Sequence, residues 1–161
     1  MNAGKILVAE RDGVYLLKLA GDVRLTMCAS ISQYLDKIFA GRSAKEVYVD
    51  LLDAECIDST TLGLLARLAL HTQRQFGFKT RLLCVSSNIL RMFETMDIDE
   101  LFEILGAVNQ PDLAPSEVTQ EGLDEEEIRR QVLEAHKLLV KLNPALMGEF
   151  YDLITSLEAQ G

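Results

Sequence analysis

The sequence has no tryptophan, only three cysteines and only two histidines. Three cysteines without a Cys-x-x-Cys spacing do not build a disulfide framework, and the separated His71 and His136 do not suggest a zinc site. We therefore expect free thiols, with no bound metal and no cofactor. The cysteines are Cys28, Cys56 and Cys84.

Long apolar runs are also missing. The longest uninterrupted apolar stretches fall far short of the roughly 20 residues that a membrane-spanning helix needs. The N-terminus has no positively charged stretch followed by an apolar one, which a secretory signal requires. From these two absences we expect a soluble cytoplasmic protein that does not enter a membrane.

Basic residues are scarce in the last third of the chain. The whole sequence carries 16 Lys and Arg against 25 Asp and Glu, a formal net charge of −9 at pH 7. Residues 107–161 hold 11 acidic and 4 basic residues, which gives −7, whereas residues 1–106 hold 14 and 12, which gives −2. Because neutralising phosphates needs clustered Lys and Arg, we expect no direct binding of nucleic acid. Any effect on transcription would act through another protein.

No set of catalytic residues stands out. The sequence has no glycine-rich phosphate-binding loop. Ser59 has no partnered base nearby, because His71 follows it by twelve residues along a predicted helix and would usually point away. We expect no enzymatic activity.

The chain does contain apolar strands that alternate with amphipathic helices. Arg11-Asp12-Gly13 predicts a turn between the first two strands. Strands that alternate with helices after an opening hairpin predict a mixed sheet with helices packed on it. The predicted strands cover residues 5–10, 14–20, 47–52, 80–84 and 101–104, and the predicted helices cover about 27–39, 61–75 and 89–96.

The composition changes after Gly106. Residues 109–127 contain Pro111, Pro115, Gly122 and seven acids but no Lys or Arg, which predicts a solvated linker. We therefore divide the chain into a domain at 1–106, an acidic linker at 107–127 and a C-terminal extension at 128–161.

The extension has two apolar stripes at helical spacing, separated by Asn143-Pro144, so it is predicted to form a helical hairpin. Two short helices are not stable alone in water, so they must pack on something. The domain, a second copy of the chain in a homodimer, or a partner could each serve. We favour docking within the chain or self-association. The stripes are Ile128, Val132, Ala135, Leu139 and Leu142, then Leu146, Phe150, Tyr151, Leu153, Ile154 and Leu157.

Residues 46–63 contain the most informative motif. An apolar, β-branched run leads through a short acidic turn to Ser59 and Thr60, where an apolar helix begins. A hydroxyl at that place can cap the first free backbone N–H groups. It can also accept a phosphoryl group, whose charge would lie near the positive end of the helix. From these residues alone the cap is the commoner outcome, and both remain open.

This segment resembles the signature of the STAS domain, the fold of bacterial anti-sigma factor antagonists. The similarity runs from about residue 4 to about 106 and includes Gly21-Asp22 where the family has Gly-Glu. It implies an α/β fold, a STAS-like mixed β-sheet with packed helices, to which this chain adds the helical hairpin. The signature is matched by Asp50-Leu51 and by Ile57-Asp58-Ser59-Thr60-Thr61-Leu62-Gly63, with Thr61 in place of a glycine.

The resemblance also implies a function. Ser59 would be the phosphate acceptor, with Thr60 as the weaker candidate. The unphosphorylated protein would bind an anti-sigma factor, often itself the serine kinase, and phosphorylation would release it; a serine/threonine phosphatase would restore binding. The helix after the motif and the loop before it would form the partner surface. The candidate contacts are Asp22, Arg24, Asp58, Thr60, Thr61, Leu64, Arg67 and Leu68.

Two departures from the family pattern affect this hypothesis. Thr61 adds bulk where the family has glycine, which would narrow the set of partners or weaken recognition by a kinase. Arg24 stands where the family usually has an acid. We favour a surface arginine that pairs with a nearby carboxylate for little energy; the alternative is that Arg24 neutralises phosphorylated Ser59.

Two other functions remain open. STAS domains also occur beside lipid and anion transporters, so the chain could be a structural or regulatory subunit of a transport system. It could also be a constitutive adaptor in which Ser59 is only a helix cap.

Overall fold

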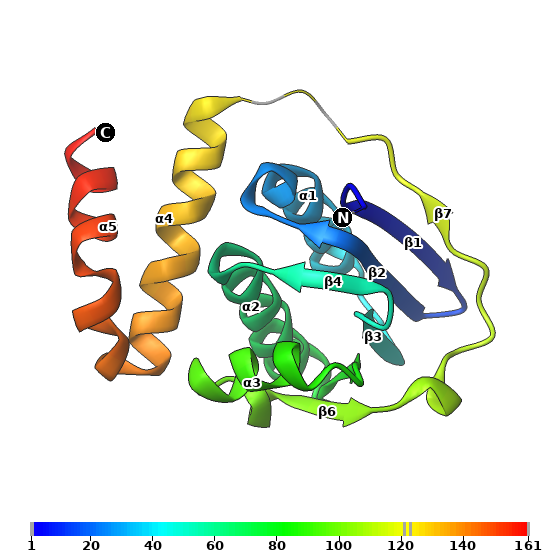
Figure 1. Ribbon diagram of the computed structural model, residues 1–161. Coiled ribbons are helices and arrows are strands. Elements are labelled where there is room, and N and C mark those ends of the chain that lie inside the picture. The colour runs from blue at the N-terminus through cyan, green and yellow to red at the C-terminus, as the bar shows by residue number, and fades with distance from the viewer. Residues whose placement is uncertain (1, 121, 123, 161) are drawn as a thin grey trace.

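The computed structural model describes residues 2–120, 122 and 124–160 (Figure 1). Met1, Glu121, Leu123 and Gly161 lie outside the described residues. Met1 belongs to the predicted domain, Glu121 and Leu123 belong to the predicted linker, and Gly161 belongs to the predicted extension. The described residues form a mixed sheet, helices packed on it and a C-terminal helical hairpin. The predicted fold class is confirmed.

The sheet combines an antiparallel edge with a parallel body. Its strands lie in the order β6-β5-β3-β2-β1-β7, and β4 pairs with the end of β2. Strand β1 is antiparallel to β2 and β7, whereas the other pairs are parallel. The strands are β1 (Lys5–Arg11), β2 (Val14–Val23), β3 (Glu46–Asp50), β4 (Ala54–Ile57), β5 (Thr80–Leu83), β6 (Phe102–Leu105) and β7 (Ser116–Glu117).

Parallel neighbours need crossover connections, and helices supply them here. Figure 1 shows α4 alongside α2, with α5 on the outer side of α4. The helices are α1 (Cys28–Ala40), α2 (Ser59–Phe76), α3 (Ser87–Thr95), α4 (Glu125–Leu142) and α5 (Met147–Ala159). Short 3-10 turns are η1 (Leu25–Met27), η2 (Asp99–Leu101), η3 (Ala107–Asn109) and η4 (Pro144–Leu146).

The core follows from the alternation of side chains along central strand β2. Leu17 and Leu19 are fully buried in the cluster that the helices cover. Leu16 points the other way, into a small cluster with Tyr48 and Leu83. Successive side chains of a strand face opposite sides, so the apolar character of both faces of β2 places it inside the sheet, as the sequence indicates.

Two glycines permit tight geometry in the first two strands. Gly13 follows Asp12 in the predicted turn, and both have positive φ angles, 84° and 54°. Gly21 has a φ of 73°, and a Cβ atom there would lie 2.5 Å from the carbonyl oxygen of Ala3. The register of β2 against β4 shifts next to Gly21.

The main differences from the predicted elements are short or terminal. Strand β4 was expected as a turn, and β7 lies inside the expected linker, where Ser116 pairs with Val8 of β1. Helix α4 begins at Glu125 instead of 128, because Asp124 caps it and three glutamates occupy its first turn. Carboxylates are favourable at that end of a helix, so part of the acid-rich stretch is helical.

Candidate functional site

The start of α2 is fixed by Asp58, which is its N-cap residue. One carboxylate oxygen accepts hydrogen bonds from the backbone N–H and the hydroxyl of Thr61, both at 3.0 Å. The other oxygen accepts from the N–H of Leu25 at 2.6 Å. Asp58 therefore ties α2 to the turn that precedes α1. The capping role that the sequence left open for Ser59 belongs to its neighbour.

Ser59 is the first residue of α2 and is half-buried. Its hydroxyl oxygen lies 2.7 Å from Nε2 of His136 on α4. Nδ1 of His136 lies 2.7 Å from the carbonyl oxygen of Val132. A carbonyl only accepts, so Nδ1 carries a proton, and in the neutral ring Nε2 accepts the hydrogen bond from Ser59. The candidate acceptor hydroxyl thus bonds to the C-terminal hairpin.

Both helices of the hairpin hold His136 in place. Its side chain is 2% exposed. The ring of Phe150 on α5 stands edge-on to it, with 4.7 Å between ring centroids. A line of contacts therefore runs from Ser59 on α2, through His136 on α4, to Phe150 on α5.

One turn further along, α2 and α4 touch at their backbones. A Cβ atom added to Gly63 would lie 2.6 Å from Cβ and 2.7 Å from the carbonyl oxygen of Ala135. Real Cβ atoms do not come so close, so glycine at 63 and a small residue at 135 are both required for this approach. Beside this contact, a hollow of about 210 Å³ lies between the helices, lined by Gly63, Leu64, Arg67, Gln131, Glu134, Ala135 and Leu138.

Several residues of the predicted partner surface are enclosed. Thr60 is 2% exposed, Thr61 0%, Leu64 2% and Leu68 0%. Thr61 uses its hydroxyl internally, on Asp58, so the bulk that replaces the family's glycine is not presented at the surface. In this structure these four side chains are not available to a partner.

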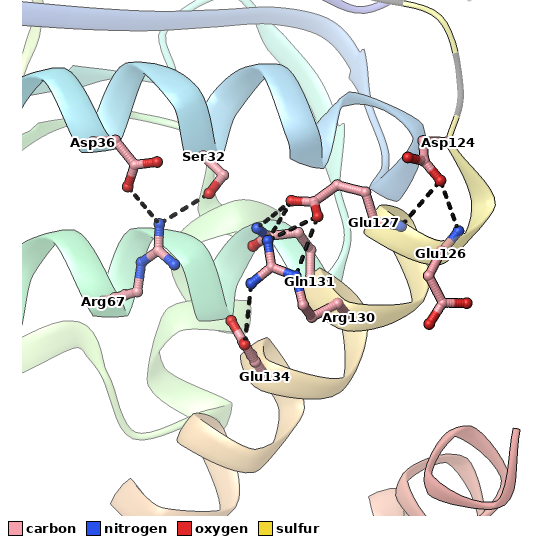
Figure 2. Close-up of polar contacts among 9 residues, drawn as sticks. All are labelled: Ser32, Asp36, Arg67, Asp124, Glu126, Glu127, Arg130, Gln131 and Glu134. Atoms are coloured by element: carbon pink, nitrogen blue, oxygen red, sulfur yellow. Dashed lines mark hydrogen bonds and ion pairs between the residues drawn. The ribbon is translucent and has the colours of Figure 1, made fainter. Parts of the chain in front are cut away.

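Arg67 remains partly exposed, with about a third of its side chain accessible. Figure 2 shows it reaching across to α1, where it donates to the hydroxyl of Ser32 at 3.1 Å and lies 4.0 Å from the carboxylate of Asp36. The guanidinium also lies over the ring of Phe39, 5.5 Å from its centroid. Arg67 therefore connects α2 to α1 beside the hairpin.

Asp22 and Arg24 lie on the other side of Asp58, at the end of β2. Arg24 pairs with Asp22 at 2.5 Å and keeps an exposed side chain. The thiol of Cys56 donates to Asp22 at 2.6 Å. This hydrogen bond and the nearby guanidinium lower the pKa of Asp22, and the same hydrogen bond raises the pKa of Cys56. An open hollow of about 510 Å³ here is lined by Asp22, Val23, Arg24, Leu25, Thr26, Cys56, Ile57 and Asp58.

The structure thus divides the predicted site into an open part around Asp22, Arg24 and Asp58 and a covered part along α2. The residue that the sequence analysis missed is His136. It follows Val132 by four residues on the same apolar stripe. A lone titratable residue on a buried face was the available signal, but its partner is 77 residues away in the sequence.

Among residues 2–120, 122 and 124–160, no cluster of three His, Cys, Asp or Glu side chains is placed to hold a metal ion. The described cysteines, Cys28, Cys56 and Cys84, form no disulfide. Over the same residues, no helix has both the length and the apolar character needed to cross a membrane.

A model of the STAS domain family matches residues 5–110. The match covers well over half of the chain, so this protein belongs to the STAS domain family, as the motif around Ser59 indicates. The matched range ends before α4, so both helices of the hairpin lie outside the matched residues.

Among solved structures, the chain resembles the crystal structure of an anti-sigma factor antagonist from Mycobacterium paratuberculosis. The TM-score is 0.52 at 20% sequence identity, over 63% of this chain and 85% of that chain. At this identity, the likeness concerns the fold.

Proposed function

We propose that this protein is an anti-sigma factor antagonist in a partner-switching pathway, which binds an anti-sigma factor until Ser59 is phosphorylated. The proposal rests on the different roles of two adjacent residues at the start of α2. Asp58 caps α2, and the hydroxyl of Ser59 makes its hydrogen bond to a side chain of another element. The Ser59 oxygen is therefore not committed to the backbone of its own helix.

Phosphorylation here is a transfer from ATP by a serine kinase. The Ser59 oxygen attacks the γ-phosphorus, the bond to the β-phosphate oxygen breaks, ADP leaves, and the hydroxyl proton passes to a base of the kinase or to water. The product carries close to two negative charges. A serine/threonine phosphatase reverses the reaction by hydrolysis.

The added charge would act on binding through desolvation. It would lie beside Asp58, within an acidic stretch that includes Asp53 and Glu55. A charge buried without compensation under a docked partner costs several kcal/mol. Since about 1.4 kcal/mol is a tenfold change, affinity would fall by a few powers of ten.

The proposed partner surface has two parts. Asp22, Arg24 and Asp58 line the open hollow, and the guanidinium of Arg24 is exposed. We propose that this guanidinium contacts the partner or, after phosphorylation, the phosphate. Arg67 offers a second accessible cation. Thr60, Thr61, Leu64 and Leu68 are proposed to contribute only from the covered face of α2.

The hairpin also has apolar side chains on its outer surface, Met147, Tyr151 and Leu153. Self-association through these residues remains a prediction. So do the location in the cytoplasm and the absence of enzymatic activity.

Affinity capture with matched baits tests the proposal. Ser59→Ala should retain the anti-sigma factor, and Ser59→Asp should bind it with an affinity lower by at least about tenfold. Ser43→Ala and Ser43→Asp are the controls, because Ser43 lies in the exposed loop between α1 and β3. Equal capture by both Ser59 baits would refute the switch. Recovery of a permease or transport ATPase in place of an anti-sigma factor would favour the transport function.

A further inference from the structure

We propose that the C-terminal hairpin, α4 with α5, is a built-in cover of the switch face of α2, and that docked α4 and phosphorylated Ser59 exclude each other. This inference rests on the proposed function in taking Ser59 as the acceptor. It adds a competitor that the chain carries itself: the hairpin occupies in cis the surface that a kinase or an anti-sigma factor must reach.

The first argument is the space around the acceptor oxygen. A phosphoryl group would be attached to the same oxygen that now lies 2.7 Å from Nε2 of His136. His136 is enclosed, with Val132 holding Nδ1 and Phe150 packed against the ring. These two contacts fix the orientation of the imidazole, which is 2% exposed, while α4 stays docked. Phosphorus and its three further oxygens would be added beside the enclosed His136 ring, and we infer that they compete with it for this space.

The second argument is that α4 cannot yield by a small shift toward α2. The contact between Gly63 and Ala135 already brings the two helices together at their backbones. Movement of α4 away from Ser59 must therefore break this contact and uncover Leu64, which lines the hollow between the two helices. Leu64, one of the predicted partner contacts, is 2% exposed under the present arrangement.

The third argument is charge. The first turn of α4 carries Glu125, Glu126 and Glu127. Burial raises the pKa of the Cys28 thiol to about 11, and the carboxylates of Asp58 and Glu127 add to the increase, so both carboxylates lie close enough to act on this one thiol. Figure 2 shows that Glu127 and Glu134 already engage the nearby Arg130. A phosphate at Ser59 would add negative charge to this region, and Arg130 would not be free to neutralise it.

The hairpin contributes Leu139, Phe150 and Ile154 to the main hydrophobic cluster, but its interface also contains unsatisfied polar atoms. Within the described residues, Nε of Arg67 and Oε1 of Gln131 are buried without a hydrogen-bond partner. A hollow separates parts of the two helices. Water would satisfy these polar atoms once the hairpin leaves, which favours release. By linkage, the contacts that hold α4 down must oppose phosphorylation to the same degree that phosphorylation opposes docking.

The test is hydrogen–deuterium exchange on the full chain with phosphoserine incorporated at position 59 during synthesis. This needs neither the kinase nor the anti-sigma factor. Amides of α4 and α5 should exchange at least about tenfold faster than in the unmodified chain, while β2 and β3 keep their protection. Phosphoserine at position 43 is the matched control and should leave the hairpin protected.

Unchanged protection of α4 with phosphoserine at 59 would overturn the proposal. It would mean that His136 binds the phosphate and the hairpin remains docked. General loss of protection, including β2 and β3, would also overturn it, because the phosphate would then unfold the domain instead of releasing a cover.

A second variant tests, without adding a charge at Ser59, whether the hairpin covers the partner surface. Ala135→Leu enlarges a side chain on α4 against Gly63 and leaves every residue of α2 unchanged. Hairpin amides should exchange faster, and capture of the anti-sigma factor should rise several-fold over the parent. If the hairpin opens and capture does not rise, the cover does not compete with the partner. The two proposals can also fail separately. If both Ser59 baits capture the anti-sigma factor equally but phosphoserine still releases α4, then the proposed phosphoswitch is refuted and the proposed cover of α2 by the hairpin is supported.

Discussion

The two sides of α2 are covered in different ways. Leu62, Leu65 and Ala69 are at most 1% exposed within the main hydrophobic cluster. The side under the hairpin is bridged by a hydrogen bond between Ser59 and His136 and by a backbone approach at Gly63. Both sides are buried, but only the second has a candidate modification site within its contacts.

The polar groups on the two sides also differ. Near the sheet, the hydroxyls of Thr72 and Thr80 are both fully buried and bond to each other at 2.7 Å. Under the hairpin, Arg67 and Gln131 each bury an atom without a partner. Replacing protein contacts by water is therefore costly on the first side and partly compensated on the second. Two equally buried sides of one helix can therefore differ in the free energy that is needed to expose them to water.

The largest expected effect comes from truncating one buried leucine to alanine on the sheet side of α2 and one on the hairpin side. Leu65→Ala and Leu139→Ala each remove a fully buried leucine, which typically costs about 2–5 kcal/mol. Leu65→Ala should destabilise the whole domain, so urea unfolding monitored by circular dichroism should shift to lower concentration. Leu139→Ala should mainly accelerate amide exchange in α4 and α5. Equal acceleration in β2 and β3 in both variants would break the distinction.

A smaller effect is expected from the hydrogen bond itself. Ser59→Ala and His136→Leu each remove one partner, and their double-mutant cycle should give a coupling energy of about 0.5–1.5 kcal/mol in urea unfolding. Ser87→Ala combined with His136→Leu is the control and should be additive, because Ser87 lies on α3. Additivity for the Ser59 pair would show that the contact contributes nothing to docking.

The smallest effect is a dependence on pH at the hairpin side. Burial lowers the pKa of His71 below its ordinary 6.5, and the charge of Arg67 acts in the same direction. The unfolded chain then binds the proton more readily, so the free energy of unfolding should fall as pH drops below about 6.5. His71→Gln should reduce this slope between pH 7 and 5, measured by urea unfolding. An identical slope in parent and variant would exclude His71 as a contributor.

Much of the fold could be predicted because its signals are local. The Asp12-Gly13 turn and the apolar strands are set by residues close in sequence. Strand β4 was missed because it is only four residues long and carries Glu55 in an acidic stretch that is also typical of a turn. Strand β7 was missed because two residues give no periodicity, and only its pairing with β1 defines it.

The site could be predicted only in part. The motif located the start of α2, but Asp58 and Ser59 are both good capping residues, so the choice between them depended on where the helix begins. The helix was expected from 61 and begins at Ser59. His136 belongs to a helix whose docking position no local pattern specifies. The amphipathic stripe predicts that α4 packs on something, and the tertiary structure adds which surface it covers.

Strand β7 also determines how far the hairpin can travel. Next to it, the backbone of Val118 donates to Ile6 at 2.8 Å, and the side chain of Gln120 donates to Gly4 at 3.0 Å. The chain is thus anchored to the sheet edge a few residues before Glu125, and each residue of extended chain spans at most about 3.6 Å. A detached hairpin would therefore stay within a few nanometres of α2, at a local concentration in the millimolar range that is usual for short tethers. An external competitor would face this concentration at every encounter, and redocking of the hairpin on unphosphorylated Ser59 would not depend on how much protein the cell contains.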